Sequence, residues 1–324
     1  MKESSRVKDE VCRLVLDAGF VRARILAPFE PAAWGVHDGD VSGPGRNFAQ
    51  GAPSLLITAL AYGSPDPGSS AEAGSAELLS IAPFARRNYY REAVKRLQGL
   101  ARQFRLRHGG RRCDYRILCN SPVPEKPLAA ACGLGAPGLN GLIITPEAGS
   151  LVILAALTLP FALEGDGPVE GFCGACGKKP PCAAACPTGA LEGGGPDPAR
   201  CIQWYASGRG DRVPPEVIWR WGRRLYGCTE CQDACVQNRR FIPGAASGEE
   251  PLPARIDGEE LLAMDDDTIR ARFKGTAMGL AWLGPAAIRR NAALGLGRYE
   301  TPPALFETGS VILNGGIIIT GPGK

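Results

Sequence analysis

Eight of the twelve cysteines in this 324-residue chain fall between Cys173 and Cys235, far more densely than an ordinary core places them. The block reads CGACGKKPPCAAACPTGA, continues through Cys201 and ends with GCTECQDAC. A disulfide framework distributes its cysteines through a short secreted domain, whereas clustered CxxC pairs supply metal ligands. Eight thiolates suit two [4Fe–4S] cubanes, so we expect this part of the chain to fold around two iron–sulfur clusters.

The spacing within the block divides the ligands between the clusters. A CxxC turn brings two thiolates onto neighbouring iron corners, and the small residues Gly174 and Ala175 make that turn sterically easy. In two-cluster ferredoxins the cysteine that precedes a proline binds the cluster other than that of its own run. By that rule, one cluster is held by Cys173, Cys176, Cys182 and Cys235, and the other by Cys186, Cys201, Cys228 and Cys231.

Two zinc sites with four cysteine ligands each are the alternative, because zinc sites also use CxxC pairs. The CPTGA ending is typical of ferredoxins, and neither of the two histidines of the chain lies near the block, which favours iron–sulfur clusters. Three of the dispersed cysteines, Cys12, Cys113 and Cys132, are expected to be small buried hydrophobic residues, as lone cysteines usually are.

The remaining composition indicates a globular protein. Hydrophobic residues make up 44% of the chain, which is enough for two or three domains, and a net charge of +4 does not by itself indicate a nucleic-acid partner. The N-terminal stretch MKESSRVKDEVCRLVLDAGF is charged and amphipathic, unlike a signal peptide, and no apolar run reaches the length of a membrane span. We therefore expect a cytoplasmic protein without a membrane partner.

Periodicity predicts the elements around the cysteines. Apolar runs bounded by turn residues predict strands at 21–28 and 54–63, one at 113–120 and two within 141–157. Helical spacing predicts helices at 1–20, 84–109, 124–135, 261–273 and 284–299. The expected organisation is an α/β domain at 1–165, a cluster domain at 166–245 and a helical segment at 246–324. The apolar stretch at 311–324 has no helical period and receives no assignment.

Several motifs occur in a fixed order between roughly residues 80 and 295. They read EKPLAAACGLG, ITPEAGS, CPTGA, ARCI, LYGCTECQDAC and IRRNAALGLG. Together they resemble the epoxyqueuosine reductase family, which consists of cobalamin-dependent iron–sulfur enzymes related to reductive dehalogenases. The resemblance implies an α/β N-terminal corrinoid-binding domain, a two-cluster ferredoxin-like module and a short C-terminal α-helical HEAT-like part.

The resemblance also implies an activity and partners. The family reductively removes the epoxide oxygen of epoxyqueuosine in a tRNA anticodon loop, with electrons passing through the clusters to cobalt. The implied electron donor is of the low-potential flavodoxin or ferredoxin type, and we expect the chain to act as a monomer. In a residue-by-residue register, the family's corrinoid contacts fall on Ile144, Ala155, Gln203 and Tyr226.

One departure concerns the acid that protonates the departing oxygen. The family carries it as an Asp in a motif resembling D-S-A-P-x-L-E, where this chain reads CNSPVPE. Cys119 takes the place of the Asp without a gap, and Asn120 takes it with a one-residue gap. A thiol with a pKa of ~8.5 could donate a proton or bind cobalt, whereas an amide cannot usefully donate one. Alternatively, Cys119 simply ends a buried strand.

Other departures affect the substrate-facing loop, where GLGAPGLN replaces a family motif resembling G-L-G-W-x-G-K-H. Ala136, Leu139 and Asn140 thus replace an aromatic and two cationic or titratable residues. The helical tail is also short for a full tRNA-binding surface. Two alternatives therefore stay open: a reductase with the same cofactors and another substrate, and a non-catalytic ferredoxin-like electron-transfer protein.

Overall fold

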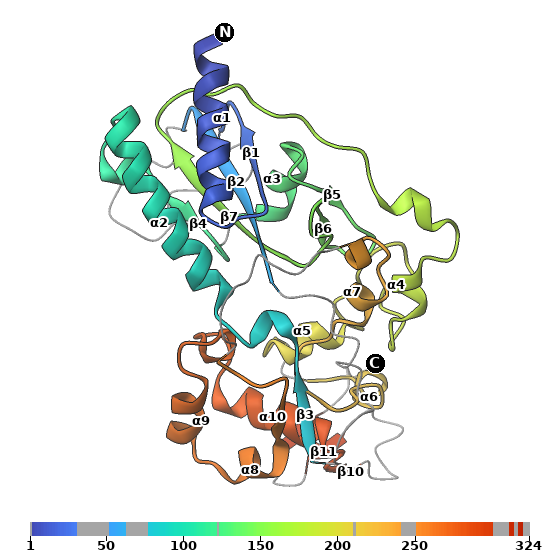
Figure 1. Ribbon diagram of the computed structural model, residues 1–324. Helices are drawn as coiled ribbons and strands as arrows, with labels where there is room; N and C mark the ends of the chain where they lie inside the picture. The colour runs from blue at the N-terminus through green and yellow to red at the C-terminus, as the bar shows by residue number, and fades with distance from the viewer. Residues whose placement is uncertain are drawn as a thin grey trace. The chain divides into compact units, whose positions relative to one another are not determined.

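The computed structural model describes residues 2–30, 52–62, 77–121, 123–209, 212–240, 251–300, 311–313 and 317–319. The chain forms two compact units that interleave along the sequence (Figure 1). The first unit comprises Met1–Ser64, Tyr89–Ala175 and Val236–Ser247, and the second comprises Pro65–Asn88, Cys176–Cys235 and Gly248–Lys324. The division into three domains at 165 and 245 stays a prediction.

The first unit is a mixed α/β structure built on a four-stranded sheet. Its helices are α1 (Lys2–Asp17), α2 (Tyr89–His108) and α3 (Glu125–Ala131). Its strands are β1 (Arg22–Leu26), β2 (Ser54–Ala61), β4 (Ile117–Leu118), β5 (Ala136–Pro137), β6 (Ile143–Ile144) and β7 (Val152–Leu159). The sheet order is β1-β2-β7-β4 with every neighbouring pair antiparallel, and β5 and β6 form a separate pair. The predicted strands and helices of this region are confirmed.

Strand β2 lies inside the first unit because every one of its residues is apolar or small enough to be covered on both faces. All eight residues of SLLITALA are buried. Alternate residues Leu55, Ile57 and Ala59 pack into a core shared with α3. The opposite face is covered by α1 and α2, which contact each other and the strands β1 and β7. This three-layer arrangement fixes β4 against β7, and the candidate catalytic loop follows the end of β4.

The second unit contains the cysteine block and the C-terminal helices. Its helices are α4 (Pro181–Ala184), α5 (Ile202–Ala206), α6 (Pro215–Ile218), α7 (Glu230–Asp233), α8 (Gly258–Ala263), α9 (Asp266–Phe273) and α10 (Pro285–Gly295). Its strands are β3 (Leu78–Ile81), β8 (Arg224–Tyr226), β9 (Arg255–Asp257), β10 (Tyr299–Glu300), β11 (Val311–Leu313) and β12 (Ile317–Ile319). One sheet has the order β8-β3-β9, and the tail contributes the sheet β10-β11-β12.

Helix α10 supports α5 through two buried polar side chains. Arg290 Nη2 donates to the carbonyl of Tyr205, and Asn291 Nδ2 donates to the carbonyl of Ala206 at 2.9 Å. Both carbonyls belong to the C-terminal turn of α5, whose orphan acceptors need partners when they are buried. The IRRNAALG motif therefore completes a helix that begins directly after Cys201.

Two expectations about local structure were wrong. The helix expected at 261–273 is divided into α8 and α9, because Asp265 caps α9 by accepting the backbone N–H of Thr268 at 2.7 Å. Cys113 is exposed, since it lies in the short 3-10 turn that follows α2. Within the described residues, no helix is both long and apolar enough to cross a membrane.

We predict that Asn291→Ala destabilises the chain by about 1–3 kcal/mol, because the buried Ala206 carbonyl then loses its donor. Thermal unfolding of the anaerobic protein, followed by circular dichroism, measures the loss. Arg270→Ala, on the exposed face of α9, serves as the control and should change stability by less than about 0.5 kcal/mol. Equal unfolding midpoints for Asn291→Ala and the control would contradict the supporting role of α10.

Candidate iron–sulfur centre and catalytic loop

Four predicted ligands of one cluster lie close together in the second unit. Burial raises the pKa of Cys231, and the nearby thiols of four other cysteines raise it further, namely Cys228, Cys201, Cys186 and Cys182. Burial also raises the pKa of Cys228 to about 11. These sulfur atoms come from α7, from the segments before α5 and α7 and from the end of α4, and α4 contacts α7. Cys182, which the spacing rule assigns to the other cluster, also lies near Cys231, so the division of the ligands between the two clusters stays a prediction.

One backbone donor and one side-chain acceptor contact these ligand residues. The N–H of Ala190 donates to Cys186 Sγ at 3.3 Å, and the N–H of Cys228 donates to Gln203 Oε1 at 3.2 Å. Amides aimed at the sulfur atoms of a cluster stabilise its negative charge. Gln203 therefore orients the segment that carries Cys228.

The other predicted set is divided between the two units. Cys173 belongs to the first unit, where its Sγ accepts the N–H of Leu139 at 3.4 Å. Cys176, Cys182 and Cys235 belong to the second unit, and the last two are buried. The CxxC turn itself is a 3-10 helix, Cys173–Cys176. The ligand set of this cluster stays a prediction.

The gathered cysteines fit a cubane in their chemistry. Among the described residues, no three His, Cys, Asp or Glu side chains converge on a single metal ion. A cubane does not require such convergence, because each of its irons takes one thiolate. Buried thiols with raised pKa values stay protonated unless a metal replaces the proton, so cluster assembly at Cys228 and Cys231 releases protons.

The candidate catalytic loop follows β4 and ends at α3. Asn120 has a φ of 50°, and it is the one non-glycine residue with positive φ in the described part of the chain. Asparagine tolerates this conformation better than most residues. The loop then closes on Glu125, whose Oε1 accepts the N–H of Ser121 at 3.0 Å. The tight turn thus depends on both the amide residue and the carboxylate at the start of α3.

Cys119 is directed inward at the end of β4. Its Sγ lies 3.8 Å from the carbonyl oxygen of Tyr90 and 3.7 Å from that of Leu154, as a donor to both. Burial, with a smaller contribution from Glu125, raises the pKa of the Cys119 thiol to about 12. The thiol is therefore fully protonated at neutral pH and satisfied by backbone acceptors.

Glu125 is a titratable group that the sequence interpretation used only to align the motif. Burial raises the pKa of its carboxyl group, although backbone N–H groups of Ser121 and Asn120 oppose that shift. Lys126 is the neighbouring cation, and burial lowers its pKa. The signal available in the sequence was an acidic residue in the first turn of a helix that directly follows the loop.

The predicted corrinoid contacts form two pairs in different units. Ile144 and Ala155 are buried in β6 and β7 of the first unit, and the Ala155 carbonyl accepts Thr58 Oγ1 at 2.9 Å. Gln203 and Tyr226 belong to the second unit, where the Gln203 side chain lies near the Tyr226 hydroxyl. The amide and the phenol can hydrogen-bond to the amide-bearing edge of a corrin, so the residues present are compatible with it.

The substituted loop of the family motif is self-contained. Ala136 pairs with Ile144 in the β5–β6 ladder, and Asn140 is buried, where its Oδ1 accepts the N–H of Leu142 at 3.3 Å. Leu139 contributes its N–H to Cys173. Ala136 and Leu139 therefore maintain the loop through their backbone and Asn140 through its side chain, and the three positions carry no titratable group.

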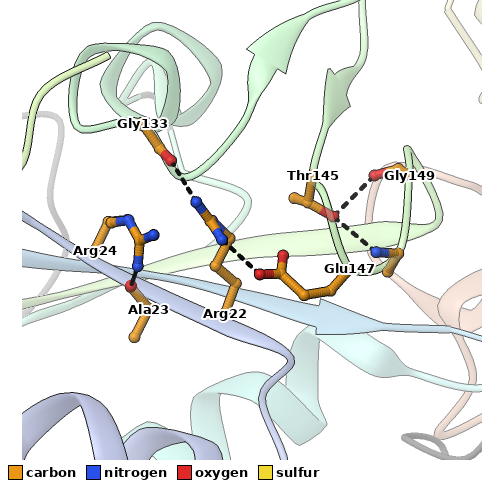
Figure 2. A network of polar contacts seen from close by, with 8 residues as sticks. Arg22, Ala23, Arg24, Gly133, Thr145, Glu147 and Gly149 are labelled. Atoms are coloured by element: carbon orange, nitrogen blue, oxygen red, sulfur yellow. Dashed lines mark hydrogen bonds and ion pairs between the residues drawn. The ribbon is translucent and has the colours of Figure 1, made fainter. Parts of the chain in front are cut away.

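The ITPEAGS motif forms a turn that is fixed by side chains (Figure 2). Arg22 of β1 donates from Nη1 to Glu147 Oε1 at 2.5 Å and from Nη2 to the carbonyl of Gly133 at 3.2 Å. Within the turn, Thr145 Oγ1 donates to the carbonyl of Gly149 at 3.1 Å.

The segment after the cysteine block fixes the same turn. Buried Asn238 accepts the N–H of Ser150 at 2.7 Å through its Oδ1. Gly149 has a φ of 54°, and a Cβ there would lie 2.1 Å from Asn238 Oδ1, so glycine is required. The motif therefore ties the residues that follow Cys235 to the first unit.

We predict that Cys231→Ala lowers the iron content of the chain from about eight to about four atoms, because one cubane loses a ligand. Colorimetric iron and sulfide determination on anaerobically purified protein measures the change. Cys113→Ala removes an exposed cysteine outside the block and should leave the iron content unaltered. If Cys231→Ala retains all the iron of the parent chain, Cys231 is not a cluster ligand.

Comparisons with known proteins agree with this chemistry. Residues 172–238 match the 4Fe-4S double cluster binding domain, which confirms the prediction of a two-cluster module. The epoxyqueuosine reductase of Bacillus subtilis is 36% identical over 188 residues, covering 57% of this chain and 47% of that protein. The enzyme of Vibrio cholerae is 29% identical over 227 residues, covering 68% and 59%. The chain thus spans about half the length of these first relatives.

Other similarities extend further. The epoxyqueuosine reductase of Synechococcus is 31% identical over 258 residues, which cover 76% of this chain and 75% of that protein. A crystal structure of epoxyqueuosine reductase with a modified tRNA-Tyr stem loop matches 90% of this chain and 81% of its own, with a TM-score of 0.72 and 26% identity. A Bacillus subtilis structure, in which a catalytic loop carrying an Asp is swung out of the active site, matches with a TM-score of 0.71 and 27% identity. The conserved order of motifs, the two-cluster module and the shared fold show that this chain belongs to the epoxyqueuosine reductase family.

Proposed function

We propose that this chain is a cobalamin-dependent iron–sulfur oxidoreductase that removes the epoxide oxygen of epoxyqueuosine in a tRNA anticodon loop. The observation that carries the proposal is the double-cluster domain at 172–238 within a chain of this family's fold. The reaction takes up two electrons and two protons, breaks both C–O bonds of the epoxide and releases its oxygen as water. A low-potential donor of the flavodoxin or ferredoxin type supplies the electrons through the clusters.

Cobalamin, when bound, supplies low-valent cobalt for C–O cleavage. Gln203 and Tyr226, with Ile144 and Ala155, are the residues proposed to hold it. Burial raises the pKa of the Tyr226 hydroxyl, which therefore stays protonated and able to donate a hydrogen bond. These residues bind and orient, whereas the proton for the departing oxygen comes from the loop between β4 and α3.

Glu125 is better suited than Cys119 to supply that proton. An efficient general acid has a pKa near the working pH, and burial moves the pKa of Glu125 upward, towards that range. The pKa of Cys119, about 12, lies far above it, and the thiol already donates to two backbone carbonyls. Asn120 contributes its backbone N–H to the Glu125 carboxyl group and so acts as a positioning residue.

The exposed face of α2 supports an RNA substrate. Arg91, Lys95 and Arg102 are exposed at helical spacing along this 20-residue helix. The one acid of the helix, Glu92, pairs with Arg96 and does not neutralise that face. A row of cations on one helix face is complementary to a phosphate backbone. The carbonyl of Tyr90, at the start of α2, lies beside Cys119, so the row begins at the candidate catalytic loop.

A reductase with the same cofactors and another substrate is the second candidate. The observation that favours it is the replacement of the family's Asp by Cys119 and Asn120, together with the altered loop at Ala136, Leu139 and Asn140. An epoxide substrate with a different chemical structure would be bound by different side chains in that loop. If no corrinoid binds, the remaining hypothesis is a non-catalytic ferredoxin-like electron-transfer protein.

Cofactor content and complementation test the proposed function. Anaerobic protein should contain about eight irons, take up one cobalamin and restore queuosine in a strain that lacks its own epoxyqueuosine reductase. Full cofactor content without restored queuosine would favour the second substrate. The same iron content without corrinoid uptake would leave an electron-transfer protein.

We predict that Glu125→Gln lowers turnover by 10²-fold or more, on the order of a lost general acid, while Cys119→Ala changes it less than about fivefold. The donor must be protonated, so wild-type turnover should fall as pH rises through the raised pKa of Glu125, and this limb should vanish in Glu125→Gln. Single-turnover rates measured from pH 5 to 9 test both points. Abolished turnover in Cys119→Ala would assign the proton to the thiol instead.

A further inference from the structure

Three of the four described tryptophans are exposed, and all three lie in the second unit. Trp204, Trp219 and Trp282 expose 36%, 53% and 45% of their surface, whereas Trp221 is fully buried. Tryptophan is usually covered in a folded protein, because its ring buries a large apolar area. A large ring left exposed in a folded unit is therefore a candidate for contact with a partner.

Trp282 is held beside α5 by polar and steric contacts. Its side chain lies near the hydroxyl of Tyr226, and so does the side chain of Gln203 in α5. Its backbone approaches the end of the same helix, since a Cβ on Gly208 would lie 3.1 Å from the Trp282 carbonyl oxygen. The exposed ring of Trp282 is therefore anchored next to the segment that carries Trp204.

Trp204 carries a stacked cation. Arg209 Cζ lies 4.7 Å from the centroid of the Trp204 ring, within the range of a cation–π contact, and both side chains are exposed. Tyr205 and Ala206, the next residues of α5, are buried, so the short helix is fixed while Trp204 stays on the surface. The pair presents a flat aromatic and guanidinium surface with a positive charge.

We infer that Trp204, Arg209 and Trp282 form a stacking surface for unpaired nucleobases of an RNA loop. The inference rests on the proposed function and adds the residues that read the loop. Single-stranded RNA is recognised by stacking of splayed bases on aromatic rings and arginine planes, with cations near the phosphates. A surface that binds an acidic electron-carrier protein would present cations that point outward to pair with carboxylates. Here the guanidinium group of Arg209 lies over the Trp204 ring instead.

The position of the surface fits that role. Trp204 lies three residues after Cys201, a predicted cluster ligand, and Gln203 between them orients the backbone at Cys228. Tyr226, which lies beside both Trp282 and Gln203, is with Gln203 also a proposed corrinoid contact of this unit. Bases next to the modified nucleotide would therefore be stacked close to the groups that carry out its reduction.

The test measures binding of the full, cluster-loaded chain to a labelled tRNA-Tyr anticodon stem–loop by fluorescence anisotropy. Trp204→Ala and Trp282→Ala should each weaken binding about five- to 150-fold, the equivalent of about 1–3 kcal/mol per stacked base. The slope of log Kd against log salt should stay that of wild type, because no phosphate contact is removed. Trp204→Phe should retain most of the affinity, and Arg209→Lys, which keeps the charge without the plane, should not.

A stem–loop whose loop nucleotides lack their bases allows a double-mutant cycle between the Trp204 ring and the RNA bases. Wild type should lose affinity for it, and Trp204→Ala should then cause no further loss, because the ring has no base to stack on. Trp219→Ala, which removes another exposed tryptophan of the same unit, should bind like wild type.

Four results would overturn the inference. The first is an affinity within twofold of wild type for both Trp204→Ala and Trp282→Ala, and the second is an equal loss of affinity in Trp219→Ala. The third is that Trp204→Ala weakens binding of the abasic stem–loop as much as binding of the intact one. The fourth is that the variants lose cobalamin uptake while their RNA affinity is unchanged. Stem–loop binding without reduction of epoxyqueuosine would refute the proposed function alone. A wild-type chain that binds no stem–loop would refute both.

Discussion

The gathering of buried thiols is the interaction on which the second unit depends. Thiol groups stabilise one another little when they lie together away from water, and burial disfavours the deprotonated thiolate that binds metal. An inorganic cluster reverses that balance, because its bonds to sulfur replace the protons and link four points of the chain. The helices α4 and α7 have four residues each and α5 has five, too few to be stable alone. The cluster supplies order to these helices, and α5 is also held by the apolar core around Trp221, to which Ile202, Tyr205 and Ala206 belong.

Support for these short helices comes from a distant part of the sequence. Arg290 and Asn291 reach the end of α5 from α10, and Gly295 of the same helix lies where a Cβ would be 2.8 Å from Leu79 of β3. The C-terminal helices therefore act as scaffold for the cysteine block.

The sequence predicted the features that are governed by local chemistry. Cysteine spacing indicated the two-cluster module, and uninterrupted apolar runs located β2 and β7, since such patterns need no knowledge of the partner strands. It did not place β3 with β8 and β9, because pairing between segments so far apart depends on packing. Cys113 was expected to be buried on the basis of residue type, and its turn exposes it. Glu125 escaped notice because its significance lies in burial beside the loop, which motif matching does not measure.

The interleaving of the two units has a consequence for how the protein is made. The first unit needs Asn238 to fix the turn at Gly149 and Ser150, so it cannot be completed on the ribosome until the whole cysteine block has been synthesised. The second unit needs β3, which emerges early, and α10, which emerges late. Both units therefore combine segments that leave the ribosome at different times, and neither corresponds to one uninterrupted stretch of the chain.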